Sequence, residues 1–345
     1  MYKIRRLFFF LLIVIVLMGA SLSCIGQTVN KNDVYQRVRL IVEPYAFDFV
    51  SWEVQAMYFL VDKRISPLEQ EERLRSHIEA VLSENGIAIF PPLNFKLEKP
   101  PQLLVISPRD RIFYLDRVIL RQNLGMDDIE RIEAEVDKLG VSSLVEELGG
   151  FGATYPPIVD GDARLTFVIE AVVEEWLHQY LAFRPLGALY VLDSIGFVQD
   201  PNIIVMNETL AGMVSDEIGS EVYNRYYSAQ EQKQTAKKSS DFDFSVEIRQ
   251  TRSDVDRYLS QGDITGAERY MEERRQVFLL NGYKMRKLNQ AYFAFHGIYA
   301  HDPASVSPIH RELKQIRTES ASLKDFLHNV SGMTSYADLI KALKR

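Results

Sequence analysis

Helical periodicity dominates the second half of the chain. Residues 165–183 are apolar on nearly every side of a helix, which predicts a helix buried in the core, and Pro185 provides its stop. Further periodic segments predict helices at residues 186–195, from Met206 onward, at 263–280 and at 284–300. The pattern therefore predicts a mainly α-helical domain over residues 149–345.

The first part of the chain mixes both periodicities. Alternating runs, typical of short strands in a small sheet, are found at residues 38–42, 93–97, 103–106 and 112–120. Helical patterns are found at residues 47–61, 66–83 and 126–139. We therefore predict an α+β fold, with a small α/β domain over residues 30–148 ahead of the helical domain. Residues 228–241 are polar and poor in apolar side chains, which predicts a mobile insertion.

A segment rich in glycine and proline leads into the predicted buried helix. Residues 149–152 (Gly-Gly-Phe-Gly) predict a flexible turn, and Pro156 and Pro157 confine the extended segment after it to a sheet edge. An exposed edge is a place where an extended peptide can add as a strand, and a plain connecting strand is the alternative. Residues 160–162 (Asp-Gly-Asp) then predict an N-cap for the helix.

The N-terminus has the pattern of an export signal. Three basic residues among the first six precede an unbroken apolar run over residues 7–18, and small residues follow before Cys24. This order is typical of a secretory signal peptide, or of a short membrane anchor where cleavage fails. We expect residues 1–26 to be this signal or anchor, and the rest of the chain to lie outside the cytoplasm, secreted or anchored to the cell membrane. Because Cys24 is the only cysteine, the exported part has no disulfide.

Charge and missing motifs argue against several classes of function. The chain has 40 basic and 47 acidic side chains, and loss of the three basic residues near its start raises the acidic excess from 7 to 10. Such acidity without a basic patch argues against nucleic acid as a partner. The glycine-rich residues 149–152 lack the Lys-Ser/Thr of a phosphate loop, and the Gly-x-Ser-x-Gly of a serine hydrolase is absent from the sequence.

The predicted buried helix carries three polar groups that can do chemistry. Glu174 and His178 are four residues apart and therefore project from one face, with Glu175 beside them. Burying such groups is costly unless they pair with each other or coordinate a metal. The face of the next helix that carries Glu208 continues with small residues, namely Ala211, Gly212, Ser215 and Gly219. Since small residues let two helices approach closely, we expect Glu208 to come against Glu174 and His178.

Two short motifs make the chain resemble a known family. Residues 174–178 form E-E-x-x-H, and residues 207–211 form N-E-x-x-A. In these motifs the chain is similar to the gluzincin zinc metallopeptidases, which include aminopeptidases and whose helix motif is H-E-x-x-H. The chain departs from the family at Glu174, where the family has a histidine, and in a longer interval between the two motifs.

The resemblance implies one divalent metal and a metallopeptidase-like helical domain. Glu174, His178 and Glu208 would be the three ligands. Zinc is the metal that the family uses. Manganese is the alternative, because two carboxylates and one imidazole form a harder ligand set than two histidines and one glutamate.

The resemblance also implies hydrolysis of a peptide bond. Glu175 would be the general base that activates water. The stripe formed by Asn289, Tyr292, His296 and Tyr299 is unusually polar for a core face. From this stripe Tyr292, or Tyr299 in its place, would steady the oxyanion. The substrate would be a peptide or protein, and in an aminopeptidase Glu170 or Asp160 would hold its free amine.

A second hypothesis needs no metal. Glu174 and His178 can form a buried ion pair, with Glu208 as a second partner of the histidine. The protein would then be a catalytically inactive, peptidase-like binding or scaffold module at the cell surface.

Overall fold

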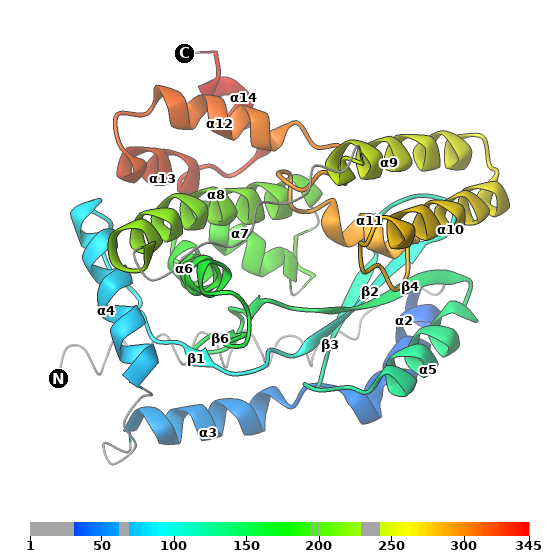
Figure 1. Cartoon of the computed structure of the whole chain (residues 1–345), viewed down its shortest axis with the longest axis horizontal. Coiled ribbons are helices and arrows are strands. Elements are labelled where there is room, and N and C mark those ends of the chain that lie inside the picture. Colours follow the sequence, from blue (N-terminus) through cyan, green and yellow to red (C-terminus); the bar gives the residue numbers. More distant parts are fainter. Residues whose placement is uncertain (1–30, 62–68, 195, 199, 229–241, 345) are drawn as a thin grey trace.

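The computed structural model shows a mixed α+β fold and describes residues 31–61, 69–194, 196–198, 200–228 and 242–344 (Figure 1). The predicted signal or anchor at residues 1–26 lies outside the described residues, as does the predicted insertion at residues 228–241 apart from Ser228. Among the helices that are described, none is long and apolar enough to cross a membrane.

A three-stranded antiparallel sheet lies in the half of the molecule that holds the N-terminal helix α2. Its strands in spatial order are β3 (Asp116–Leu120), β2 (Gln102–Pro108) and β4 (Val141–Glu147). Leu104 and Ile106 of the central strand pack on one face against α2 (Lys31–Val42) and α5 (Met126–Asp137). Leu103 and Val105 pack on the other face against α11 (Gln290–His296). The strand is buried on both sides because its successive side chains alternate between these two layers.

A second, smaller sheet lies below the helical core. Its strands in spatial order are β1 (Lys96–Leu97), β6 (Ile158–Val159) and β5 (Gly150–Phe151). The predicted edge position of the segment after Pro157 is therefore wrong, since β6 is the central strand and is fully buried. Pro156 and Pro157 precede the strand, so their missing N–H groups do not interrupt its ladder. The edge strand beside the core helix is β5.

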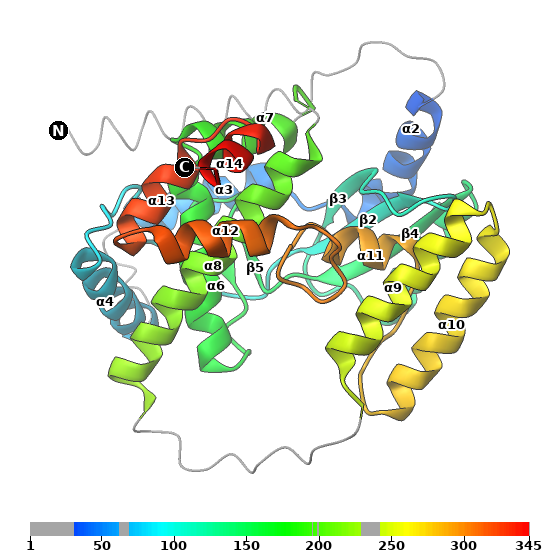
Figure 2. The same ribbon diagram turned by 90° about the horizontal axis from the view of Figure 1, so that it is seen from above.

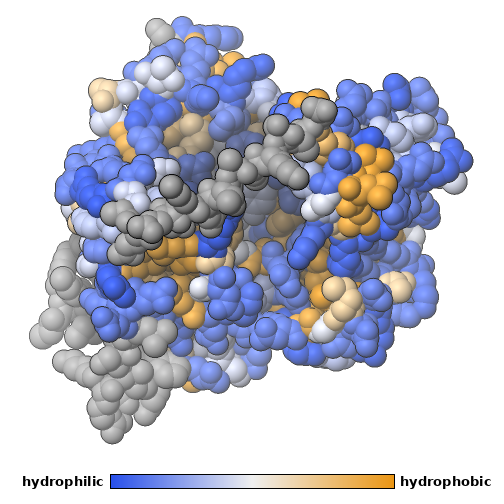
Figure 3. Space-filling model, in the orientation of Figure 1, coloured by the Kyte–Doolittle hydropathy of each residue, from blue (hydrophilic) through white to orange (hydrophobic). Residues whose placement is uncertain are grey.

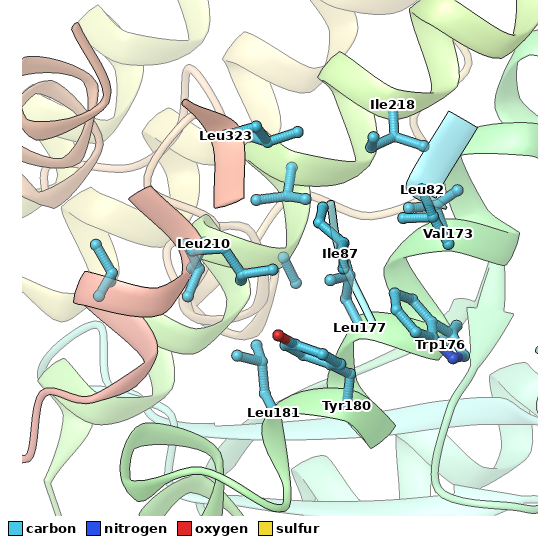
Figure 4. Packing of buried hydrophobic residues seen from close by; sticks show 14 of the residues in the cluster. Leu82, Ile87, Val173, Trp176, Leu177, Tyr180, Leu181, Leu210, Ile218 and Leu323 are labelled. Carbon is cyan, nitrogen blue, oxygen red and sulfur yellow. The ribbon is translucent and has the colours of Figure 1, made fainter. Parts of the chain in front are cut away.

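The largest hydrophobic cluster surrounds the predicted buried helix, α6 (Leu165–Leu181). Figure 4 shows its side chains Val173, Trp176 and Leu177 meeting residues from α4, α8 and α13. These neighbours are α4 (Glu69–Glu84), α8 (Pro201–Tyr226) and α13 (Leu323–Ser331), with α7 (Pro185–Ser194), α12 (Ile309–Glu319) and α14 (Tyr336–Ala342) around them. Helix α4 precedes residue 148, the predicted boundary between the two domains, and yet it belongs to this core. The division into two domains stays a prediction.

Two long helices form a separate layer. In Figures 1 and 2, α9 (Phe244–Ser260) and α10 (Ile264–Leu280) lie side by side next to α11 and the larger sheet. They enclose a hydrophobic cluster of their own. The face seen in Figure 3 is mostly hydrophilic, and hydrophobic residues gather in both halves of it, one group lying on the side of α9 to α11. The remaining elements are the 3-10 helix Glu43–Tyr45 and α3 (Phe49–Val61).

Most predicted helices are confirmed, but three local predictions are wrong. Residues 38–42 belong to helix α2, because Val34, Val38 and Val42 repeat at helical spacing toward one cluster and a five-residue window does not reveal that period. Helix α8 begins at Pro201, five residues before the predicted start, with Asp200 as its N-cap. Helix α11 begins only at Gln290 because the Asn289 side chain caps it.

The predicted N-cap of the buried helix is also wrong. Arg164 stands at that position and makes no capping hydrogen bond through its side chain. Asp160 instead accepts hydrogen bonds from Lys99 Nζ, at 2.7 Å, and from the backbone N–H of Asp162. The acidic side chain therefore stabilises the turn after β6 and not the helix start.

One buried acid of α3 holds the segment between β5 and β6. Glu53 Oε1 accepts a hydrogen bond from the backbone N–H of Tyr155 at 3.0 Å, and Glu53 Oε2 has no partner among the described residues. Glu53 is 8% exposed, and its burial raises its pKa to about 7. Burial thus favours the neutral acid in the folded protein.

We expect Glu53→Gln to make the protein more stable at pH 8 and to change little at about pH 3. Well below its ordinary pKa of 4.5, Glu53 holds its proton in both the folded and the unfolded state. As the pH rises toward 7, the unfolded chain loses this proton and the folded protein keeps it, so the free energy of unfolding falls. The difference between pKa values of about 7 and 4.5 corresponds to about 3 kcal/mol. Urea denaturation at both pH values measures the effect. Glu98→Gln, an exposed control, should leave the free energy of unfolding unchanged at both pH values. An equal change in both variants would contradict the raised pKa of Glu53.

Candidate metal centre

Helices α6 and α8 pack closely enough to bring the two predicted motifs together. A Cβ atom at Gly219 of α8 would lie 2.7 Å from Glu170 Cγ of α6, so only glycine permits this approach. Ala211 and Ser215 are buried on the same helix. The small residues predicted on one face of α8 therefore allow α8 to approach α6 closely, as expected.

The structure brings Glu174, His178 and Glu208 together. Each offers one ligand atom, and these atoms lie within 4.8 Å of one another. His178 Nε2 is 3.4 Å from Glu208 Oε2. Glu208 is buried, and Glu174 and His178 are half-buried. This group, which we call the Glu-His-Glu centre, could hold a metal ion.

Two neighbouring side chains orient the ligands. His178 Nδ1 is 2.9 Å from Asn207 Oδ1, and because an amide oxygen only accepts, Nδ1 carries a hydrogen and Nε2 is the atom that could bind a cation once it has lost its proton. The Tyr190 hydroxyl donates to Glu208 Oε1 at 2.7 Å, and its ring stacks on His178 with centroids 5.6 Å apart. Leu186 and Tyr190 are four residues apart on one face of α7, a signal that could have placed Tyr190 in the sequence prediction.

Burial raises the pKa values of Glu174 and Glu175 of α6. Burial, with a further contribution from Glu175, raises the pKa of Glu174 to about 8. Burial raises the pKa of Glu175 to about 7, although the charge of His178 opposes this shift. Three acidic groups around one imidazole thus favour a positive charge between them.

The His178–Glu208 pair shows the opposite electrostatic pattern. Burial disfavours the charged forms of both, but their mutual attraction outweighs it. The pKa of His178 is raised to about 10, and the pKa of Glu208 is lowered by His178, Tyr190 and Arg117. In the absence of a metal the proton on His178 supplies the positive charge that the acids favour. A divalent cation at the centre would take its place.

The glycine-rich strand β5 fixes the position of Glu175. A Cβ atom at Gly150 would lie 2.6 Å from Glu175 Cγ and closer still to Oε1, and one at Gly152 would lie 2.6 Å from Oε2. Gln179 of α6 donates to the carbonyl oxygens of Gly152 and Thr154, at 3.2 and 2.7 Å. The strand therefore passes directly over the Glu175 carboxylate, and glycine is needed at both positions.

Of the two predicted tyrosines, Tyr299 is the one on which the charges of the centre act. Burial raises the pKa of Tyr299, and the charges of Glu208 and Glu174 raise it further. The next residue, Ala300, donates its N–H to Thr209 Oγ1 at 3.2 Å, which fixes this segment beside Glu208. Tyr292 packs instead against the rings of Phe293 and His296, and the charges that act on it are those of Asp302 and Glu146.

The two acids nominated for amine binding have different surroundings. Glu170 lies one turn before Glu174, where burial and the charge of Asp216 raise its pKa. Asp160 forms a salt bridge with Lys99 at 2.7 Å, in the turn after β6. Only Glu170 is placed on the helix that carries the centre.

The geometry thus provides three ligand atoms from two helices, with a further carboxylate and a tyrosine beside them. No protein-family model, curated protein or solved structure matches the chain. The functional proposal below therefore rests on the residues of this site.

Proposed function

We propose that the protein is a metal-dependent peptidase with the Glu-His-Glu centre as its metal site. The observation that carries the proposal is the convergence of Glu174, His178 and Glu208 within 4.8 Å. It is supported by the hydrogen bonds that orient two of them, from His178 to Asn207 and from Tyr190 to Glu208. Oriented ligands of this kind are typical of metal sites and unnecessary for a simple ion pair.

The remaining residues have roles in hydrolysis under this proposal. A divalent metal at the centre supplies Lewis acidity. Glu175 takes the proton from the attacking water and passes it to the leaving amine. Tyr299 donates a hydrogen bond to the oxygen on which negative charge develops. It replaces Tyr292 in this role because the charges of Glu208 and Glu174 act on Tyr299 and not on Tyr292. An extended peptide that adds to the edge strand β5 would pass close to Glu175.

The metal, the substrate and the location are parts of the same proposal. Zinc is the first candidate, and manganese is the second because the ligand set has two carboxylates. The substrate is a peptide or protein outside the cytoplasm, and the protein is secreted or held at the membrane by residues 1–26. These roles follow the resemblance to the gluzincin metallopeptidases in residues 174–178 and 207–211.

Metal analysis of the purified full-length chain tests the proposal. We expect about one zinc or manganese ion per chain, and at least a tenfold loss of affinity in Glu208→Gln and His178→Ala because each removes a ligand. Glu174→Gln should behave in the same way if its carboxylate is a ligand. The exposed control Glu98→Gln should keep the metal. A metal-free protein whose melting temperature is unchanged by zinc and manganese would disprove the metal site.

A second candidate function is a metal-free binding or scaffold module. The direct contact between His178 Nε2 and Glu208 Oε2, 3.4 Å long, favours it because the pair can satisfy itself. In that case His178→Ala destabilises the fold, zinc has no effect on melting, and binding of a partner protein is retained.

A further inference from the structure

An arginine from the larger sheet lies next to the Glu-His-Glu centre. Arg117 of β3 is half-buried, and its Nη2 donates to Ser194 Oγ of α7 at 2.7 Å. Its charge helps to lower the pKa of Glu208, after the larger effects of His178 and Tyr190. The guanidinium therefore stands close to the metal site, on the side of Glu208 and Tyr190.

This arginine has no carboxylate partner in the part of the chain that the structure describes. Arg109 and Arg286 each hold a glutamate at 2.6 Å, but no acidic oxygen of the described residues lies within 4.0 Å of the Arg117 nitrogens. The charge of Arg117 opposes the rise in the pKa values of Asp116 and Asp193, but neither acid forms an ion pair with Arg117. A guanidinium has five N–H donors in a planar fork. The bond to Ser194 uses one of them, and the oxygen of Tyr114 accepts from another.

A second donor, the hydroxyl group of Tyr114, lies beside Arg117. This hydroxyl is buried, and its hydrogen has no acceptor among the described residues. Burial raises the pKa of Tyr114 and the charge of Arg117 opposes this, which places the two groups side by side. Because a guanidinium only donates, Arg117 cannot accept the hydrogen of the Tyr114 hydroxyl. Buried polar groups are nearly always hydrogen-bonded, so the Tyr114 hydroxyl hydrogen indicates a missing acceptor beside Arg117.

We propose that Arg117 and Tyr114 bind a carboxylate of the substrate next to the metal centre. The proposal rests on the proposed peptidase function and narrows its substrates to peptides with a carboxylate close to the scissile bond. The planar fork of Arg117 matches the two oxygens of a carboxylate, and Tyr114 adds a neutral donor. The carboxylate is either the C-terminus of a peptide or the side chain of an aspartate or glutamate, since both present the same group.

Peptide binding to the inactive full-length variant Glu175→Gln tests the proposal. The probes are four tetrapeptides: tetra-alanine with a free C-terminus, the same peptide as its amide, and two amides with glutamate or glutamine at the third position. Calorimetry should show the free acid or the glutamate amide binding at least tenfold tighter than its neutral counterpart, the range expected of hydrogen bonds to a charged group. The acidic probe that binds more tightly than its neutral counterpart shows whether the site binds a C-terminal or a side-chain carboxylate.

Variants separate recognition from a structural role. Arg117→Gln in the same background should abolish the difference between acidic and neutral peptides, and Arg117→Lys should keep part of it because the charge remains. Tyr114→Phe, which keeps the buried ring, should weaken binding of the acidic probe several-fold and leave the neutral probe unchanged. A difference that survives Arg117→Gln overturns the proposal, as does equal or absent binding of all four probes.

The test also distinguishes this proposal from the peptidase proposal. Hydrolysis of acidic and neutral peptides at equal rates by the native protein, with equal binding, would refute the carboxylate site and leave the peptidase intact. Preferential binding of an acidic peptide to a protein that hydrolyses none of them would refute the peptidase and leave the carboxylate site intact.

Discussion

Glu175→Gln is expected to reduce peptide hydrolysis at least a hundredfold and to leave the metal bound. The substitution keeps the size of the side chain but removes its ability to accept a proton, and general base catalysis contributes about 10²–10⁴-fold. Glu175 lies under β5, outside the group of three ligand atoms, so its loss should not weaken the metal site. The measurements are kcat/KM on a peptide mixture and the metal content of the same sample.

The controls give each outcome a meaning. Glu98→Gln makes the same chemical change at an exposed position and should be fully active. Loss of metal in Glu175→Gln would show that Glu175 is a ligand and that base and ligand have been exchanged in our assignment. Unchanged hydrolysis with the metal in place would show that another group is the base.

Gly150→Ala should damage both stability and activity. The added Cβ would lie 2.6 Å from Glu175 Cγ and nearer to Oε1, so either β5 or the carboxylate must move. Overpacking of this kind costs about 1–3 kcal/mol. A displacement of the base by about 1 Å can cost on the order of a hundredfold in rate. Chemical denaturation and kcat/KM measure the two effects separately.

A matched control and a double mutant locate the cause. A Cβ atom added at Gly332, whose φ is −81°, would make only ordinary van der Waals contacts at 3.5 Å, so Gly332→Ala should be nearly neutral. Removing the carboxylate with Glu175→Ala should make Gly150→Ala much less destabilising, because the clash is with that side chain. Full activity of Gly150→Ala would mean that β5 does not hold Glu175 in place.

The Glu-His-Glu centre could be predicted because its information is local. Glu174 and His178 are one helical turn apart, and Glu208 lies on a helix whose small residues indicate close approach. Arg117 could not be predicted in the same way. It reaches the centre from a strand of another layer, and its neighbours in the sequence carry no pattern that indicates this position.

An element of the fold can be predicted when its hydrophobic pattern repeats over a long segment. Helix α6 and helix α10 repeat over 17 residues each, whereas strands β1, β5 and β6 have two residues each and depend on contacts with distant segments. Helix α9 is absent from the predicted elements although Ile248, Val255 and Leu259 recur on one face behind the N-cap Asp243. The sequence therefore contains the pattern that predicts helix α9.

The hydrogen bond from Ala300 to Thr209 has a consequence for the order of folding. It joins residues 91 positions apart, and Arg117 lies about as far from Glu208 in the other direction. Closing such long loops costs more conformational entropy than pairing α6 with α8, because these two helices are close in the sequence. The ligand atoms can therefore assemble from adjacent helices, and Tyr299 joins them only when the distant segments have docked. Under the proposed function, a chain that folds in this order would form its metal ligands before the groups proposed to act on a peptide.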